Sequence, residues 1–371
     1  MTGARTGRPA LSVLDLVPVP TGCTVRQALA DSLDLVVSAE SLGYAGYWFG
    51  EHHFTPGRAG SVPALLVAIA AERTSRIRIG SAANVLHASH PLALVEQFGT
   101  LAEVHPGRVV LGLGRGAGVR EIPQSAASAA ALARFADFDY RTAGIPVEPD
   151  AAVYPDLVPT LTQVGSEDEE TRLGMLLSLL HRPVTERYGH LIAATPGYGT
   201  GLVPWIFGNT PGTSARMAAR YGLPFVVNAH IASNPGPAAA AYREQFVPSP
   251  ALPEPYVGIS AHVLVAERRE EADWLATAYP PTVRDMFGRG MIGTVPAPGA
   301  VVEVPPDAPW AAAYEAGLAA RHIGQPAAVA ASLAELAASA EADEVLVGTV
   351  THRPADRLRS YELLIDAWRE L

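Results

Sequence analysis

The stretch Ile77–Gly116, IRIGSAANVLHASHPLALVEQFGTLAEVHPGRVVLGLGRG, places a helical pattern between two short apolar runs. The runs, Ile77–Ala83 and Arg108–Gly114, have the length and composition of strands, and Pro91–Val104 has the apolar spacing of a helix. Strands that are joined through a helix by short connections form right-handed crossovers and pair in parallel. The stretch therefore predicts a β-α-β unit of a parallel sheet.

The same alternation extends to both sides of this stretch. The expected strands are Leu11–Leu16, Tyr44–Gly50, Ile77–Ala83, Arg108–Gly114, Leu202–Phe207, Pro224–Ala229, Gly258–Ala266 and Glu344–Thr349. The expected helices are Thr24–Leu42, Ser61–Thr74, Pro91–Val104, Glu167–Leu180, Gly212–Tyr221, Pro235–Phe246 and Arg269–Ala278, with two more around the last strand. Eight strands is the number that closes a TIM barrel.

A doubly wound open sheet is the competing architecture. It would place a glycine-rich phosphate turn after its first strand, whereas VPVPTGCTV follows Leu16 and contains no such motif. We therefore expect a single (β/α)8 TIM barrel with insertions over residues 1–371, with a tail at 1–10. Residues 118–201 are interpreted as an elaborated excursion with an alanine-rich helix. Residues 280–309, rich in proline and glycine, are interpreted as a mobile lid or a disordered segment.

Composition narrows the function classes. Cys23 is the only cysteine, which excludes an intrachain disulfide and a zinc site built on several thiolates. The formal charge of -10 is spread along the chain without a Lys or Arg cluster, so nucleic acid is not an expected partner. The N-terminus MTGARTGRPA lacks an apolar signal region, and no apolar run is long enough to span a membrane. We expect a cytoplasmic protein without a membrane partner.

Active sites of such barrels lie at the carboxyl ends of the strands. The second strand ends in YWFGEHHF, which places Glu51, His52 and His53 at the barrel mouth. Adjacent residues on an extended segment point to opposite sides, so this histidine pair does not predict a metal site. We take His52 as the functional histidine and Glu51 as a partner that orients an imidazole.

The third and fourth strands bring small residues and a cation to the same end. Ala82 and Ala83 leave room for a flat ring, although small residues there fit ordinary barrel packing equally well. His90 follows in the same connection. Arg115 stands between two glycines, a combination suited to phosphate, with a surface salt bridge as the alternative.

After the fifth strand, GNTPGTSARMAARYG gathers Thr210, Thr213 and Ser214 at the start of a helix. Helix N-termini bind anions through unpaired amides. Simple N-capping by Thr213 or Ser214 is the alternative. Together with Arg115, this helix start favours a phosphate site.

Taken in order, the segments SVLDL, GYWFGEHH, GSAANVL, HPLALVEQFGTLAEVHPGRVVLGLGRG, GLPFVVNAH, ADEVLVGT and HRPADRLRSYELL resemble the bacterial luciferase-like flavin monooxygenases over residues 11–370. The resemblance implies a TIM barrel that binds FMN in its mouth, with a cis peptide bond at Ala82–Ala83 against the ring. It assigns His52 and His90 as the site histidines.

For the phosphate, the resemblance implies Arg115, Thr213 and Ser214, with Thr210 in the phosphate loop. Luciferase itself has a reactive cysteine where this chain has Gly114, and a Glu-Ser pair where it has Thr210 and Pro211. The resemblance to luciferase therefore implies general monooxygenation for this chain, but not light emission.

The implied reaction uses reduced FMN and O2 to oxygenate a small organic substrate through a flavin hydroperoxide. We expect His52 to titrate near neutral pH as its acid or base, and residues 280–309 to close over the site. Since no NAD motif is present, reduced flavin would come from a separate reductase, and a homodimer is expected. The alternatives are a deazaflavin-dependent dehydrogenase on the same barrel, a non-catalytic flavin-binding protein and a phosphate-sugar isomerase.

Overall fold

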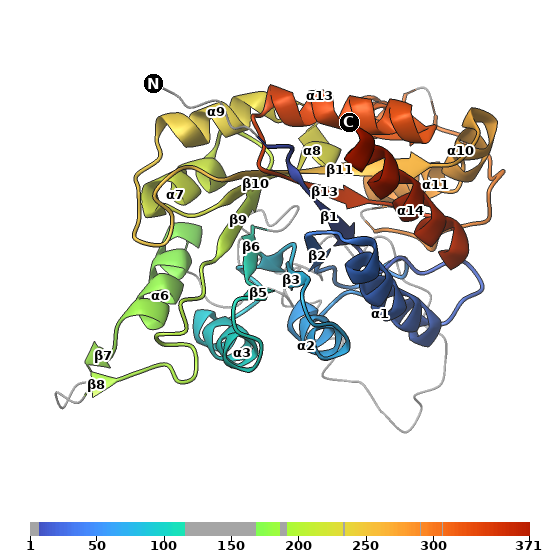
Figure 1. The fold of residues 1–371 in the computed structure, drawn as a ribbon. Coiled ribbons are helices and arrows are strands. Elements are labelled where there is room, and N and C mark those ends of the chain that lie inside the picture. The colour runs from blue at the N-terminus through green and yellow to red at the C-terminus, as the bar shows by residue number, and fades with distance from the viewer. Residues whose placement is uncertain (1–6, 116–167, 186–190, 233, 290, 306) are drawn as a thin grey trace.

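A computed structural model describes residues 7–115, 168–185, 191–232, 234–289, 291–305 and 307–371 (Figure 1). The expected alanine-rich helix and most of the excursion at 118–201 lie outside these residues. So does most of the expected tail at 1–10.

Two short strands, β7 (Val184–Thr185) and β8 (Leu191–Ile192), pair antiparallel with each other. Ten further strands form one parallel sheet that closes on itself. They are β1 (Ala10–Asp15), β2 (Gly46–Phe49), β3 (Arg78–Ser81), β4 (Asn84–Val85), β5 (Val109–Val110), β6 (Gly112–Gly114), β9 (Trp205–Gly208), β10 (Phe225–Val227), β11 (Val257–Val265) and β13 (Glu344–Gly348). Neighbouring strands pair in the order β4-β6-β9-β10-β11-β13-β1-β2-β3-β5. Since β3 runs on into β4, and β5 into β6, the two ends of this order join. The expected eight-stranded barrel is confirmed.

Helices surround the barrel (Figure 1). They are α1 (Val25–Leu42), α2 (Pro63–Arg73), α3 (Pro91–Val104), α6 (Glu169–His181), α7 (Thr213–Tyr221), α8 (Ala229–Ala232), α9 (Gly236–Glu244), α10 (Arg269–Ala276), α11 (Pro280–Arg289), α12 (Ala311–Ala319), α13 (Pro326–Ser339) and α14 (Pro354–Glu370). Sequence features set their ends: Thr24 and Gln27 form a capping box on α1, and Gly43 ends α1 in the left-handed conformation.

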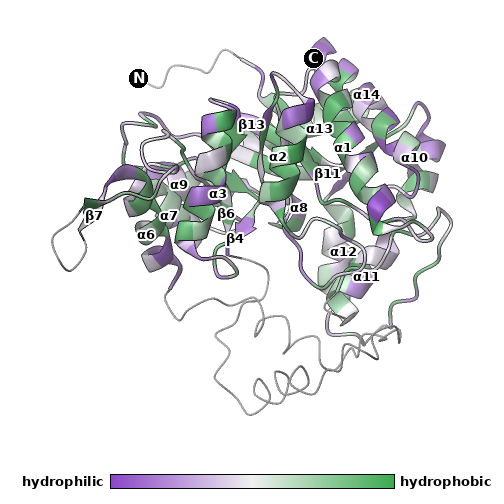
Figure 2. Ribbon diagram, turned by 90° about the horizontal axis from the view of Figure 1, so that it is seen from below, coloured by the Kyte–Doolittle hydropathy of each residue, from purple (hydrophilic) through white to green (hydrophobic). Residues whose placement is uncertain are grey.

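Two apolar layers hold the barrel. Alternate strand residues such as Val13, Phe225 and Ile259 pack outward against the helices, which mix hydrophobic and hydrophilic residues (Figure 2). The intervening residues fill the interior, where the rings of Trp48 and Trp205 lie 4.9 Å apart. The barrel centre is therefore packed, and a ligand must bind at its mouth.

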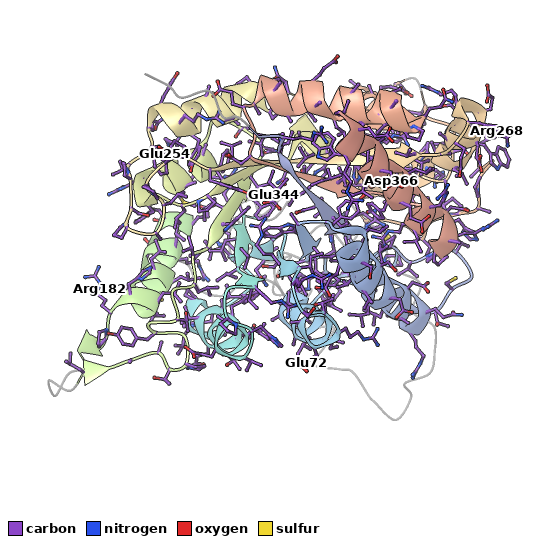
Figure 3. The ribbon with its side chains drawn as sticks, in the orientation of Figure 1. Glu72, Arg182, Glu254, Arg268, Glu344 and Asp366 are labelled. Carbon is purple, nitrogen blue, oxygen red and sulfur yellow. The ribbon has the colours of Figure 1, made fainter. Side chains whose placement is uncertain are left out.

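A buried ion pair fills the opposite end of the interior. Arg78 donates to Glu344 over 2.9 Å, and the Tyr256 hydroxyl donates to the same carboxylate over 2.8 Å. Ser12 donates to the other carboxylate oxygen. Glu344 is fully buried and lies at the centre of the molecule in Figure 3. The partners satisfy this charge inside the barrel.

The connections after β11 hold three elements that the sequence analysis missed, one of which is helix α12 (Ala311–Ala319). The helix α11 begins within the expected loop at 280–309, and strand β12 (Arg321–Gly324) pairs with β11 beyond the end of β10. Val295 exchanges backbone hydrogen bonds with Val19 and Thr21, and the Gly57 amide donates to Ile292 over 2.8 Å. The segment from Ile292 to Val295 thus packs beside the barrel mouth. Its movement stays a prediction.

Candidate functional site

His52 lies beside the Ala82–Ala83 segment at the barrel mouth. Its backbone amide donates to Gly60 over 2.8 Å, which fixes the loop after β2. A Cβ atom on Gly50 would lie 3.3 Å from His52 Cε1 and 3.5 Å from the Ala82 carbonyl oxygen, so the imidazole and this carbonyl are close neighbours. The peptide bond between Ala82 and Ala83 is cis, and that expectation is confirmed.

The His52 imidazole is neutral at neutral pH. Burial lowers its pKa to about 3, and the positive charge of Arg58 acts in the same direction. Its Nδ1 atom is buried, with no hydrogen-bond partner among the described residues. The expectation that His52 titrates near neutral pH is therefore wrong, because the loop desolvates the ring. A neutral imidazole has one donor and one acceptor nitrogen, so the ring can still hydrogen-bond a ligand through its other nitrogen, Nε2.

Glu51 connects two strand ends. One carboxylate oxygen lies 2.8 Å from His53 Nε2, and the other accepts from Asn84 Nδ2 over 2.9 Å. The imidazole that Glu51 orients is thus that of His53. This bridge ties the loop after β2 to the residue that follows the cis peptide.

Arg115 lies next to the loop that leads into α7. Strands β6 and β9 pair Gly112 with Trp205 and Leu113 with Ile206, and continuation of this register sets Arg115 beside Gly208. Arg115 is partly exposed, and no ion pair holds it within the described part of the chain. The alternative of a surface salt bridge is not seen there.

The N-terminus of α7 is open. The helix begins at Thr213 after Gly212, and no side chain caps it, so the N-capping alternative is wrong. Ser214 is 3% exposed, and its hydroxyl has no partner among the described residues. Thr213 Oγ1 accepts from Arg216 over 3.3 Å, and Thr210 is exposed. Uncapped amides and a free buried hydroxyl, with Arg115 at the end of the neighbouring strand, together suit an anion.

His90 is placed differently. It is exposed, and its Nδ1 atom accepts from the Leu92 amide over 3.3 Å at the start of α3. The described contacts bind His90 to α3 and not to His52. Its catalytic role stays a prediction.

Two further histidines that the sequence analysis left without a role also reach the mouth; His262 is buried and His230 is half-buried. The rings of His230 and His262 lie 5.0 Å apart, and His230 Nδ1 lies 2.6 Å from Ser260 Oγ. Burial lowers the pKa of His230 to about 4, and that of His262 well below its usual value. In the sequence, the sign that could have pointed to a site here is that His262 interrupts the apolar strand GISAHVLV.

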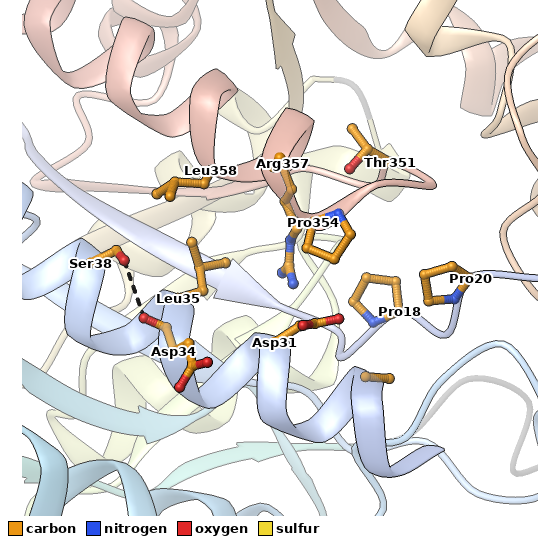
Figure 4. A pocket seen from close by; sticks show the side chains of 12 residues that line it. Pro18, Pro20, Asp31, Asp34, Leu35, Ser38, Thr351, Pro354, Arg357 and Leu358 are labelled. Atoms are coloured by element: carbon orange, nitrogen blue, oxygen red, sulfur yellow. Dashed lines mark hydrogen bonds between the residues drawn. The ribbon is translucent and has the colours of Figure 1, made fainter. Parts of the chain in front are cut away.

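A groove of about 180 Å³ lies between α1 and α14 (Figure 4). Asp31 and Asp34 line it from α1, and Arg357 lines it from α14. Arg357 also donates to the buried carboxylate of Asp15 over 2.6 Å. The groove lies between outer helices and lacks the residues described above, so we do not place the cofactor there.

The described residues hold neither a metal-binding cluster nor a helix that could span a membrane. No group of three or more His, Cys, Asp or Glu side chains in this part of the chain is arranged to hold a metal ion. None of its helices combines the length and apolar character that a membrane span requires.

The sequence of the chain is similar to those of luciferase-like monooxygenases. Residues 11–139 match the family model described as luciferase-like monooxygenase. An uncharacterized protein of Bacillus subtilis (strain 168), YvbT, is 33% identical over 97% of this chain and 96% of its own. A protein of Escherichia coli (strain K12) named luciferase-like monooxygenase is 30% identical over 98% of each.

Solved structures show the same fold. Apo-MsnO8 is 28% identical, with a TM-score of 0.76 and 98% of each chain covered. The oxygenating constituent of 3,6-diketocamphane monooxygenase in complex with FMN is 17% identical, with a TM-score of 0.62 over 96% of this chain and 97% of its own. An F420-dependent secondary alcohol dehydrogenase is 13% identical, with a TM-score of 0.63 over 98% of this chain and 100% of its own.

Proposed function

The chain belongs to the luciferase-like monooxygenase family, and from this premise we propose that it uses reduced FMN and O2 to oxygenate a small organic substrate. We further propose that a separate reductase supplies the reduced flavin to a cytoplasmic homodimer. The observation that carries the FMN assignment is the open N-terminus of α7 beside Arg115. This pair suits a phosphate group.

The residues present fit FMN along the mouth. A Cβ atom on Gly114 would lie 3.3 Å from Ala83 Cβ and 3.9 Å from Phe207 Cβ, so the small residues adjoin the phosphate end. Ala82 and Ala83 would lie against the ring. Arg115, the amides of α7 and the free hydroxyl of Ser214 would hold the phosphate, with Thr210 and Thr213 beside it.

Reduced flavin supplies the activation of O2 when it is bound. The protein contributes position, exclusion of water and control of protons. His52 keeps a neutral imidazole beside the Ala82 carbonyl, where its Nε2 atom would hold a hydrogen bond at a reacting group without adding a charge. The segment around Ile292 and Val295 packs beside the mouth and shields it from water.

The test separates binding from chemistry. The purified chain is titrated with FMN by fluorescence, and is then incubated with a flavin reductase, NADH and candidate substrates under ¹⁸O-labelled oxygen. We expect saturable FMN binding and labelled product. His52→Ala should keep the FMN affinity and lose product formation, whereas the matched variant His181→Ala, at an exposed position of α6, should keep both.

Absence of FMN binding would refute the cofactor assignment, and unchanged turnover in His52→Ala would remove this residue from the mechanism. A deazaflavin-dependent dehydrogenase is the second candidate, because an F420-dependent enzyme shares the fold. Binding of F420 in preference to FMN, with oxidation of an alcohol in the absence of O2, would select it. FMN binding with no oxygen consumption would instead select a non-catalytic flavin-binding protein.

A further inference from the structure

Ser260 and His230 form a hydrogen-bonded pair at the barrel mouth. Ser260 on β11 pairs in register with Leu346 of β13, which packs inside the barrel, so the serine side chain also faces the interior. Ser260 is fully buried, and its hydroxyl lies 2.6 Å from His230 Nδ1. His230 belongs to α8, which follows β10 directly. The pair therefore joins α8 to the neighbouring strand β11 (Figure 1).

The buried hydroxyl of Ser260 fixes the tautomer of His230. Ser260 Oγ has no other hydrogen-bond partner in the part of the chain that the structure describes, so its proton has an acceptor only if the hydroxyl donates to Nδ1. Nδ1 is then unprotonated, and the proton of a neutral imidazole lies on Nε2. Burial lowers the pKa of His230 to about 4, so the ring is neutral at neutral pH. Nε2 of His230 is thus an uncharged N–H donor.

This donor is open, whereas the rest of the ring is held in place. His230 is half-buried, and among the described residues its Nε2 atom has no hydrogen-bond partner. The ring lies 5.0 Å from that of His262, at an angle of 67°. His262 is fixed in turn, because a Cβ atom on Gly348 would lie only 3.3 Å from its Nδ1 atom, and its ring lies 5.1 Å from that of Tyr279. His230 is therefore braced by Ser260 and His262, with Nε2 left for a ligand.

The groups that surround this donor are uncharged. Burial keeps the pKa of His262 well below its usual value and raises that of Tyr279, so both rings are neutral at neutral pH. No ion pair involves His230 or His262 within the described ranges. Arg321 contacts the ring of Tyr279, with its Cζ atom 5.0 Å from the centroid, and has no printed contact with His230. His230 thus offers a single N–H donor among neutral rings.

The barrel places the Ser260–His230 pair opposite the proposed flavin site. With β5 and β6 counted as one strand, β11 is the fourth strand from β3 in both directions, through β5/β6, β9 and β10 or through β2, β1 and β13. In the same way, β10 is the fourth strand from β2. The pair therefore lies across the mouth from Ala82, Ala83 and His52. A flat ring against Ala82 and Ala83 would turn its other face toward His230.

We propose that His230 binds the organic substrate of this enzyme, with Nε2 donating a hydrogen bond to an oxygen acceptor, and that Ser260 is the positioning residue that directs this donor. Since the donor and its neighbours are neutral, the class of substrate that fits is an uncharged molecule with a carbonyl-type oxygen. A carboxylate would lose its hydration here without gaining a counter-charge. The assignment to the substrate rests on the function proposed above.

The first experiment tests the tautomer without any ligand. In protein labelled with ¹⁵N at histidine, long-range ¹H–¹⁵N spectra at pH 7 distinguish protonated from unprotonated ring nitrogens. We expect the proton of His230 on Nε2 in the wild type, and a mixture of tautomers in Ser260→Ala. His322 is the matched control, because its Nδ1 atom lies 2.8 Å from Ser332 Oγ between β12 and α13. Its signals should not change in Ser260→Ala. A proton on Nδ1 of His230 in the wild type would overturn the proposal.

The second experiment compares three ligands of similar size by isothermal titration calorimetry on the chain loaded with FMN. They are cyclohexanone, methylenecyclohexane, which lacks the oxygen, and cyclohexanecarboxylate, which is charged. Cyclohexanone should bind about fivefold more tightly than methylenecyclohexane, as one neutral hydrogen bond requires. It should also bind more tightly than cyclohexanecarboxylate, and should shift the Nε2–H signal of His230 but not the signals of His322.

Variants locate this preference. In His230→Phe, which keeps an aromatic ring but no N–H, cyclohexanone and methylenecyclohexane should bind alike. Ser260→Ala, in which Nε2 carries the proton only part of the time, should lower the preference for cyclohexanone. His322→Phe, the control, should keep the wild-type preference.

Three results would overturn the proposal. They are equal binding of cyclohexanone and methylenecyclohexane in the wild type, a preference that survives in His230→Phe, and tighter binding of cyclohexanecarboxylate than of cyclohexanone. If one of the two variants at His230 and Ser260 does not fold, the other carries the test. Failure of both to fold would mean that the pair serves the fold, and would overturn the proposal as well.

FMN alone separates this inference from the proposed function. If FMN shifts the Nε2–H signal of His230 and cyclohexanone adds nothing, His230 contacts the cofactor, so the inference fails and the proposed function stands. If the chain does not bind FMN but still binds cyclohexanone through His230, the proposed function fails and the carbonyl site stands. Arg115→Gln should lose affinity for FMN and keep the wild-type tautomer of His230.

Discussion

Replacement of His262 by asparagine should make the protein less sensitive to acid. The ring is 6% exposed, and its contact with the Gly348 carbonyl is long, at 3.4 Å. Burial keeps its pKa well below 6.5, with the nearby charges of His230 and Arg58 acting in the same direction. The folded protein therefore holds this imidazole neutral at pH values where the unfolded chain protonates it.

The sign and size of the effect follow from proton linkage. Below pH 6.5 the unfolded state binds one more proton at this position than the folded state does, so stability falls as the pH falls. Since each pH unit is worth about 1.4 kcal/mol for one proton, His262 accounts for a loss of roughly 2 kcal/mol between pH 7 and pH 5. His52 and His230 add losses of the same sign.

Urea unfolding of the wild type and of His262→Asn at these two pH values measures the effect. The two proteins differ in absolute stability for other reasons, so the informative quantity is the change between pH 7 and pH 5. That change should be smaller in His262→Asn by about 2 kcal/mol. His181→Asn, at an exposed position of α6, is the matched control and should follow the wild type. Identical pH dependence in His262→Asn and the wild type would refute the reasoning.

Three further changes test the scaffold. Asp15→Asn leaves Arg357 buried without its partner and should lower the free energy of unfolding by about 3 to 5 kcal/mol, measured in urea; a loss below 1 kcal/mol would contradict this. Gly112→Ala places a Cβ atom 1.9 Å from the Ser81 carbonyl oxygen and should prevent soluble folding, with native circular dichroism as the contrary result. Thr24→Ala removes the cap of α1 and should cost about 1 kcal/mol without a change in FMN affinity.

The parts of the site that follow strand ends were open to prediction from sequence. In a parallel barrel the carboxyl ends of all strands meet at one end, so His52, Ala82 and Arg115 were placed together by the strand pattern alone. Glycine and hydroxyl residues in GNTPGTS marked the start of α7. The cis peptide bond came from the family resemblance, since no local signal distinguishes it.

Burial and distant packing were not open to prediction. The neutral state of His52 depends on the loop through Gly60 and on Arg58, and the burial of Arg58 depends on packing that its neighbours PGRAG do not encode. Helix α11 was missed because its first residues, Pro280 and Pro281, also begin loops, although proline is tolerated in a first helical turn. The expected strands Tyr44–Gly50 and Ile77–Ala83 were longer than the observed β2 and β3, because apolar or small residues continue past both ends of each strand.

The ion pair of Arg78 and Glu344, against the ring of Trp205, fills one end of the barrel interior. The barrel is therefore open only at the end where the strands finish. In the function proposed above, the cofactor and the substrate would share this one opening. We would then expect ordered binding, in which the molecule that lies deeper binds first and leaves last. The packed interior of the barrel would thus set the order of binding.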